Sequence, residues 1–177
     1  RQMCIRDRHK PALLRQNPGP EWCRPDNGVA QCEPQLQVVQ LTERRLVVPV
    51  TVHCGWRGLA AGIVGNTIQA MQTPSESILA WMGPAIGPCH FEVGRDVYGA
   101  LSAILSEDVM ASAFTPATGE KFMANLYEIA TALLRKQGVL RISGGGLCTS
   151  CDQRRFFSYR VSPVCGRIAT TICIRSA

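Results

Sequence analysis

The segment Val52-His53-Cys54-Gly55-Trp56-Arg57-Gly58 places an imidazole and a guanidinium beside two glycines. A side chain at the end of a buried strand is held rigidly, and glycines let a ligand approach the backbone. The imidazole of His53 can ligate a metal or move a proton, although a structural role fits the spacing equally well. Arg57 can hold an anion such as phosphate, or it can brace the turn.

Two other stretches contain thiols. Residues 83–90 form a loop rich in Gly and Pro that ends in the adjacent pair Cys89 and His90. Because neighbours in an extended chain point apart, we do not expect these two side chains to ligate one metal together, although either can line a pocket. Cys148-Thr149-Ser150-Cys151 is a single Cys-x-x-Cys, and no second such pair supplies the four ligands of a structural zinc site. The sequence therefore assigns no metal to this pair.

The elements that must position these residues alternate between strands and helices. Apolar periodicity predicts helices over residues 57–71, 93–105 and 122–133, the last one capped by Gly138. Strands are predicted over residues 46–52 (ending at His53), 78–82, 139–142, 156–159 and 167–174. Residues 1–35 contain five prolines and no sustained period. The pattern predicts one mixed α and β domain that begins near residue 37.

Composition excludes several classes of protein. The chain has 177 residues, 46% hydrophobic and 18% charged, which excludes disorder and fibrous folds. Its nine cysteines are odd in number and irregularly spaced, which favours reduced thiols and a cytoplasmic location. No apolar run reaches the 18 residues of a membrane helix, so no membrane partner is expected. The net charge of +6 comes without a nucleic-acid-binding motif, so we interpret the basic C-terminal third as a solvated face.

Three motifs resemble, in their order and spacing, those of the bacterial laccase-domain family. That family is also called the multicopper polyphenol oxidase or YfiH-like family, and its members are treated as purine nucleoside phosphorylases. The resemblance covers roughly residues 40–177. It is carried by residues 52–62, by residues 78–94, and by Cys148-Thr149 with Phe156-Phe157-Ser158-Tyr159-Arg160 and Gly166-Arg167-Ile168-Ala169.

The resemblance implies an α+β fold, a single-domain mixed α/β sandwich of the YfiH-like (CNF-like cysteine hydrolase) type whose N-terminal part is missing. Residues 1–36 are then expected to be a non-native or disordered leader, the product of a truncated or frame-shifted reading of the gene. Residues 37–177 are expected to form a partial laccase-like, purine nucleoside phosphorylase domain.

The resemblance also implies a reaction. Family members are similar in cleaving adenosine, inosine and methylthioadenosine with phosphate at a zinc site, with an additional adenosine deaminase activity. The partners implied are a purine nucleoside and phosphate, with no nucleic acid and no membrane, and both a monomer and a homodimer remain open. The older family name implies copper and phenol oxidation, for which three histidines in the chain are too few.

Site residues carry over only in part. The family holds its metal with a His in Gln-Val-His-Gly, a Cys in Ala-Asp-Cys and the His that corresponds to His53, but the first two motifs do not occur here. Cys32 is the nearest candidate for the missing thiol. The resemblance therefore implies His53 and Cys32 as metal ligands and His53 and Arg57 as catalytic. It also implies substrate binding by Arg57, Cys89 and Glu92.

Two alternatives stay open. In the first, the protein is a thiol hydrolase in which His53 activates a nearby cysteine, without a metal. In the second, the chain is a catalytically dead fragment, or a scaffold that only binds purines, because it lacks the full metal site.

Overall fold

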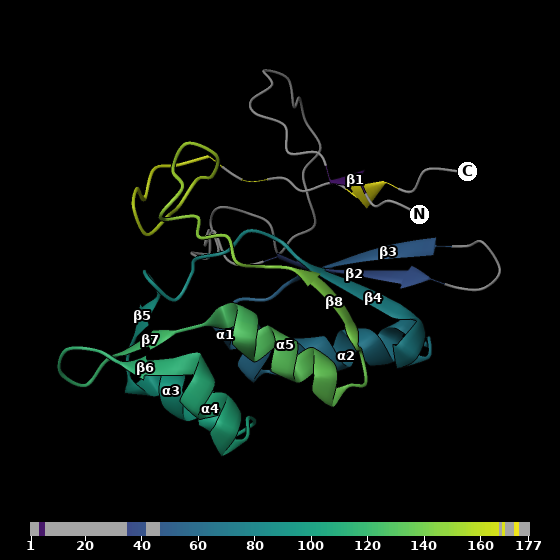
Figure 1. The fold of residues 1–177 in the computed structure, drawn as a ribbon, viewed down its shortest axis with the longest axis horizontal. Coiled ribbons are helices and arrows are strands. Elements are labelled where there is room, and N and C mark those ends of the chain that lie inside the picture. The colour runs from purple at the N-terminus through teal and green to yellow at the C-terminus, as the bar shows by residue number, and fades with distance from the viewer. Residues whose placement is uncertain (1–3, 6–34, 42–46, 167, 169–171, 174–177) are drawn as a thin grey trace.

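The main sheet has four strands and lies above three of the helices in the view of Figure 1. The computed structural model describes residues 4–5, 35–41, 47–166, 168 and 172–173. The strands lie in the order β3 (Val47–His53), β2 (Gln35–Leu41), β4 (Ile78–Met82) and β8 (Arg141–Gly144). Strand β2 is antiparallel to both β3 and β4, whereas β4 and β8 are parallel. The predictions of strands over residues 46–52, 78–82 and 139–142 are confirmed within two residues.

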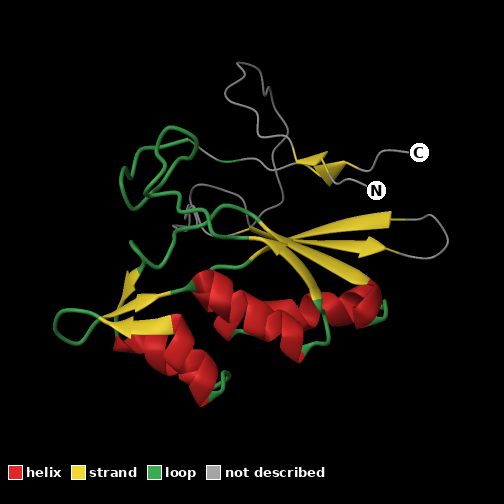
Figure 2. Ribbon diagram, in the orientation of Figure 1, coloured by secondary structure: helices red, strands yellow, loops and turns green. Residues whose placement is uncertain are grey.

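Three helices cover one face of this sheet, as Figures 1 and 2 show: α1 (Trp56–Ala60), α2 (Ile63–Met71) and α5 (Leu126–Lys136). The prediction of one helix over residues 57–71 is wrong, because two separate helices, α1 and α2, occupy this range. Gly62 adopts a φ of 79°, a left-handed conformation that interrupts a right-handed helix. The break lets α1 leave the strand end at a different angle from α2.

A second, smaller layer contains the antiparallel strands β5 (Glu92–Val93), β7 (Phe122–Ala124) and β6 (Phe114–Pro116), with helices α3 (Arg95–Ser102) and α4 (Glu107–Ala113) beside them. Val93 and Phe122, which were predicted to begin helices, lie in strands instead. Phe122 stacks on Tyr98 with ring centroids 4.3 Å apart, and Phe114 meets both rings edge-on. These aromatic contacts explain why the period-3.6 pattern extended beyond the helices.

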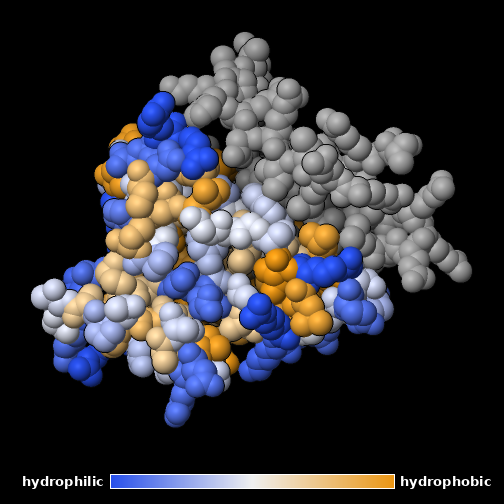
Figure 3. Space-filling model, viewed as in Figure 1, coloured by the Kyte–Doolittle hydropathy of each residue, from blue (hydrophilic) through white to orange (hydrophobic). Residues whose placement is uncertain are grey.

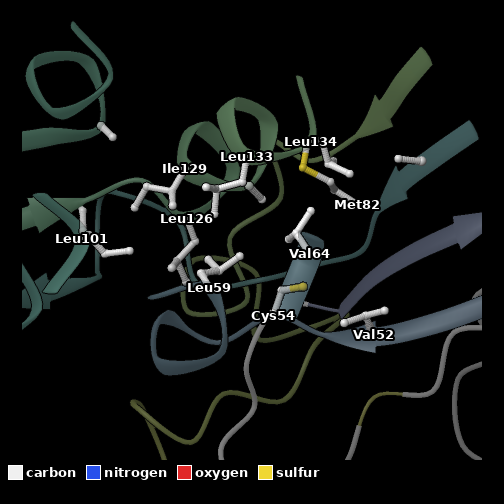
Figure 4. Packing of buried hydrophobic residues seen from close by; sticks show 14 of the residues in the cluster. Val52, Cys54, Leu59, Val64, Met82, Leu101, Leu126, Ile129, Leu133 and Leu134 are labelled. Carbon is white, nitrogen blue, oxygen red and sulfur yellow. The ribbon is translucent and has the colours of Figure 1, made fainter. Parts of the chain in front are cut away.

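The core lies between the helices and the main sheet (Figure 4). On α5 the predicted apolar stripe is buried: the exposed fractions of Leu126, Ile129 and Leu133 are 2%, 0% and 9%. Burying an aliphatic side chain of this size contributes about 1.5–3 kcal/mol. The side chain of Asn125 caps α5 by accepting hydrogen bonds from the backbone N–H groups of the first turn. Local pattern and tertiary burial therefore agree on this helix.

The C-terminal part departs most from prediction. Residues 156–159 do not form a strand, although Phe156 and Ser158 are buried while Phe157 and Tyr159 are exposed. Turns flank this stretch: the N–H of Phe156 donates to the carbonyl of Asp152, and the N–H groups of Val161 and Ser162 donate to the carbonyl of Ser158. Of the strand predicted over residues 167–174, only the short β9 (Ile172–Cys173) is described, paired with β1 (Cys4–Ile5). In the described part of the chain, no helix has the length and apolar character needed to cross a membrane.

Candidate functional site

Three strands of the main sheet end at the same side of the molecule. Because β2 is antiparallel to both β3 and β4, and β4 is parallel to β8, strands β3, β4 and β8 run in one direction. Leu36 pairs with both Val52 and Met82, and Met82 pairs with Gly144, so the three strands finish nearly level. We call this side the carboxyl end of the sheet. Loops after parallel strands commonly carry binding sites.

His53 is the last residue of β3, and its side chain is exposed at the carboxyl end of the sheet. The turn at Gly55 leads directly into α1, on which Arg57 is also exposed. The guanidinium of Arg57 stacks over the ring of Trp56, 4.5 Å from its centroid. This stacking fixes the stem of Arg57 and leaves its in-plane N–H donors available to an anion. His53 and Arg57 are therefore presented together by one rigid strand–helix turn.

A cluster of thiols and an imidazole lies at the same end of the sheet. It brings together Cys89 and His90, from the loop after β4, with Cys148 and Cys151, from the loop after β8. One ligand atom from each residue lies within 4.8 Å of all the others. The Nδ1 atom of His90 is 3.2, 3.6 and 3.4 Å from the sulfurs of Cys89, Cys148 and Cys151. This arrangement, which we call the Cys/His cluster, can hold a metal ion.

Backbone contacts bring the two loops together. The N–H of Gly87 donates a hydrogen bond to Sγ of Cys148 (3.2 Å), and the N–H of Thr149 donates to the carbonyl of Ala85 (2.9 Å). Gly87 allows this approach because a Cβ atom there would lie 2.9 Å from Cβ of Cys148. The loops are thus aligned by their backbones before any metal is considered.

Tyr127 of α5 ties the same two loops to the helical layer. Its hydroxyl accepts a hydrogen bond from the N–H of Ala85 (2.7 Å) and donates to the carbonyl of Leu147 (2.7 Å). Burial of the ring raises the pKa of Tyr127 from 10.0 to about 12. The phenol therefore remains a neutral donor throughout the physiological pH range.

The thiols of the cluster do not share negative charge equally. Burial opposes ionisation of Cys148, but hydrogen bonds from the backbone of Gly87 and from neighbouring groups of the cluster outweigh it and lower the pKa to about 6. Hydrogen bonds to the thiols of Cys89 and Cys148 raise the pKa of Cys151 from 9.0 to about 12. The first thiolate of the cluster accordingly forms at Cys148. The thiolate is the form of cysteine that binds metals.

The expectation that Cys89 and His90 point apart is wrong. It assumed an extended chain, whereas the N–H groups of His90 and Phe91 both donate to the carbonyl of Gly87 and close a tight turn. In a turn, adjacent side chains can face one point. Sequence reasoning also missed that Cys148 and Cys151 have partners, because the second pair of ligands is a Cys-His pair about sixty residues earlier. The available signal was that each pair follows a strand.

The other predicted residues are distributed over different places. Glu92 lies on β5, where its carboxylate forms an exposed ion pair with Lys121 at 2.6 Å. Cys89 belongs to the Cys/His cluster, and His53 is not among its four residues. Cys32 lies outside the described residues. The roles assigned to His53, Arg57, Cys89, Glu92 and Cys32 therefore stay predictions.

The fold and the Cys/His cluster define a mixed α/β protein with a potential metal site at the carboxyl end of its sheet. The family described as "Multi-copper polyphenol oxidoreductase laccase" matches residues 28–175. The chain belongs to this family, as its motifs predicted.

Relatives in this family carry a common functional name. The chain is 40% identical over 147 residues to "Purine nucleoside phosphorylase PA4543" of Pseudomonas aeruginosa, which covers 82% of this chain and 58% of the relative. It is 44% identical over 120 residues to "Purine nucleoside phosphorylase YfiH" of Escherichia coli, covering 68% of this chain and 48% of that protein. The chain thus spans about half the length of the relatives that it matches.

Solved structures agree on the fold. The crystal structure of Neisseria meningitidis protein NMB0706 superposes with a TM-score of 0.73 at 36% identity, over 82% of this chain and 59% of that one. The crystal structure of YlmD from Geobacillus stearothermophilus gives a TM-score of 0.63 at 29% identity, over 72% and 49% of the two chains. The mixed α/β architecture is therefore that of the family.

Proposed function

We propose that the protein is a cytoplasmic, zinc-dependent purine nucleoside phosphorylase with adenosine deaminase as a side activity. The observation that carries the proposal is the 40% identity, over 82% of this chain, to a relative named purine nucleoside phosphorylase. The turn from His53 to Arg57, which presents both side chains at the carboxyl end of the sheet, supports it. The proposed substrates are adenosine, inosine or methylthioadenosine together with phosphate.

The reaction exchanges one bond at the ribose. A phosphate oxygen attacks C1′ while the bond from C1′ to the purine nitrogen breaks, and the purine leaves with the electron pair and takes up a proton. The products are the free base and ribose 1-phosphate. Deamination consumes water instead and converts adenosine to inosine and ammonia.

Arg57 is proposed to bind and orient the phosphate, since its guanidinium offers paired N–H donors to two phosphate oxygens. Its stacking on Trp56 limits the conformations from which the phosphate can attack. Cys89, on the loop after β4, and Glu92, on β5, are retained as proposed substrate contacts because the family resemblance implies them.

The proposed zinc has His53 and Cys32 as ligands, and bound there it would supply Lewis-acid chemistry. His53 suits this role because its imidazole is exposed at a rigid strand end. Cys32 lies outside the described residues, so His53 is the proposed ligand whose position the structure describes.

The thiol-hydrolase alternative has less support. It requires a cysteine near the end of β3 that His53 can activate, and Cys54, which follows His53 in the chain, is 1% exposed and lies within the hydrophobic core (Figure 4). A nucleophile must reach its substrate, and a thiol buried among apolar side chains does not. A catalytically dead chain remains the competing outcome of the experiment below.

The test is product analysis with purified protein. Incubation with inosine or adenosine and phosphate is expected to yield free base and ribose 1-phosphate in equal amounts, and omission of phosphate should abolish base release. His53→Ala is expected to lower kcat/KM at least about 100-fold, since it removes a group at the reacting centre. Arg57→Ala should chiefly raise the KM for phosphate, with partial recovery in Arg57→Lys.

Arg95→Ala is the matched control, because Arg95 forms an exposed ion pair with Glu120 and is assigned no role in the site. It should retain full activity. Absence of base and inosine above the enzyme-free blank, with correctly folded protein and added zinc, would establish the dead-chain alternative.

A further inference from the structure

The Cys/His cluster has the dimensions of a tetrahedral metal site. With zinc–sulfur bonds of about 2.3 Å and zinc–nitrogen bonds of about 2.0–2.1 Å, a tetrahedron separates two sulfurs by about 3.8 Å and a sulfur and a nitrogen by about 3.6 Å. The Nδ1 atom of His90 lies 3.2–3.6 Å from the three sulfurs, and Sγ of Cys89 lies 3.4 Å from Sγ of Cys151. One ion fits between these atoms with shifts of at most about 1 Å, since all four ligand atoms lie within 4.8 Å of one another.

The spacing of the ligands along the chain fits the same interpretation. Cys148 and Cys151 have the two-residue spacing that recurs in structural zinc sites, and Cys89 and His90 supply the second pair. The turn around Gly87, with its N–H bonded to Sγ of Cys148, provides the outer hydrogen bond that orients a metal-binding thiolate. All three cluster cysteines are free thiols, so no disulfide competes for them.

The loop after β8, which carries Cys148 and Cys151, is held by hydrogen bonds and buries few apolar side chains. Residues 145–166, here called the loop segment, form no helix or strand beyond an isolated bridge between Ala85 and Cys148. Phe156 is its one buried apolar side chain, and it lies outside the core cluster. Figure 3 shows hydrophilic and hydrophobic residues side by side on the surface at the upper left, and the exposed apolar side chains of the loop segment include Phe157 and Val164. A chain with so few apolar contacts needs another source of order.

We propose that Cys89, His90, Cys148 and Cys151 bind one zinc ion that fixes the loop segment to the loop after β4. Four protein ligands close the coordination shell, which is the arrangement of structural rather than catalytic zinc. The site is distinct from the one proposed around His53. Strand β3 ends at His53, and strand β4 leads to the cluster. Because β2 lies between them, β3 and β4 are about 10 Å apart.

The proposal does not depend on the nucleoside phosphorylase activity. A chain without that activity can still hold the ion, and an active chain can lack it. The test therefore measures the metal and the order of the loop segment, and does not measure turnover.

Metal content is the first measurement. Protein purified with a thiol reductant and reconstituted with Co²⁺ is expected to bind one equivalent at the cluster and to show the intense sulfur-to-metal charge-transfer absorption of tetrahedral thiolate coordination. The Cys89→Ser/Cys151→Ser double variant should lose this absorption and one metal equivalent. Cys165→Ser is the matched control that should retain both, since Cys165 does not belong to the cluster.

The second measurement reports on the loop segment in wild-type protein, so it does not depend on whether a variant folds. Trypsin should cleave after the exposed residues Arg154, Arg155 and Arg160 at least about tenfold faster once a chelator has removed the metal, in line with the ~1.4 kcal/mol that a tenfold change represents. Cleavage after Arg135, in the last turn of α5, should change little.

Two results overturn the proposal. One is reduced wild-type protein that binds no Co²⁺ with thiolate absorption. The other is a metal content and a thiolate absorption that are both unchanged in Cys89→Ser/Cys151→Ser, which would place the ion at ligands outside the cluster. Equal tryptic cleavage with and without metal would reject the structural role of a bound ion.

Discussion

The helical layer and the loop segment (residues 145–166) are stabilised in different ways. Helices α1, α2 and α5 bury a continuous set of aliphatic side chains against the main sheet, among them Leu59 and Leu134 at 0% exposure. The loop segment leaves Phe157, Tyr159, Val161 and Val164 at least 39% exposed and buries mainly polar side chains. The first region is held by the hydrophobic effect, and the second by hydrogen bonds and the Cys/His cluster. Each region should therefore respond to a different kind of substitution.

The largest effect is expected in the helical layer. Leu134→Ala removes a fully buried side chain and should lower the free energy of unfolding by about 2–5 kcal/mol, because it leaves a cavity. Leu140→Ala is the matched control: Leu140 is 75% exposed, and its loss should change stability by less than about 0.5 kcal/mol. Urea unfolding followed by circular dichroism measures both. Equal effects would contradict the assignment of Leu134 to the core.

A smaller effect is expected where the two regions meet. Tyr127→Phe keeps the ring and removes the hydroxyl that bonds Ala85 and Leu147, at a cost of about 1–3 kcal/mol for the groups left unpaired. Amide hydrogen exchange should accelerate at Ala85 and Thr149. Tyr159→Phe, at a position 45% exposed, should leave exchange unchanged. Unaltered exchange in Tyr127→Phe would mean that the loops are held independently of α5.

Substitution of Gly87, between the two loops, and of Gly99, in helix α3, should change stability in opposite directions. Gly87→Ala should destabilise the protein by about 1–3 kcal/mol, since the new methyl group would lie 2.9 Å from Cβ of Cys148. Gly99→Ala meets no atom within 4 Å and lies inside α3, so it should stabilise by about 0.5–1 kcal/mol. Thermal unfolding measures the two shifts. Stabilisation by both substitutions would disprove close contact between the two loops.

The last prediction concerns alkaline pH. Because folding raises the pKa of Tyr127 from 10.0 to about 12, the unfolded state ionises first, and the folded state loses stability as pH rises between these values. The stability advantage of wild type over Tyr127→Phe should thus be constant below about pH 9 and shrink above pH 10. An absorbance titration should show a tyrosine that ionises near pH 12 in wild type and is absent from Tyr127→Phe. A constant advantage up to pH 11 would argue against burial of this phenol.

The helical layer was easier to predict from the sequence than the loop segment, because apolar burial leaves a pattern in the sequence and the hydrogen bonds of a loop do not. Residues 126–136 were predictable as an amphipathic helix because burial repeats with the helical period, and residues 78–82 as a buried strand because they are a short apolar run closed by Gly83-Pro84. The helix break at Gly62 escaped prediction because a glycine within an apolar period gives no sign of a left-handed φ. The strand predicted over residues 156–159 does not form, because the backbone hydrogen bonds here are made in local turns, which the aromatic side chains of this stretch do not reveal.

The sequence by itself determined the family, the main elements of the helical layer and the presence of His53 and Arg57 in one strand–helix turn. All of these depend on residues near one another in the chain. Only the tertiary structure decided that Cys89 and His90 meet Cys148 and Cys151. The parallel pairing of β4 with β8 ends both strands at one side of the sheet, so the loops that follow them lie side by side. Contacts across some sixty residues depend on strand register, which local periodicity does not encode.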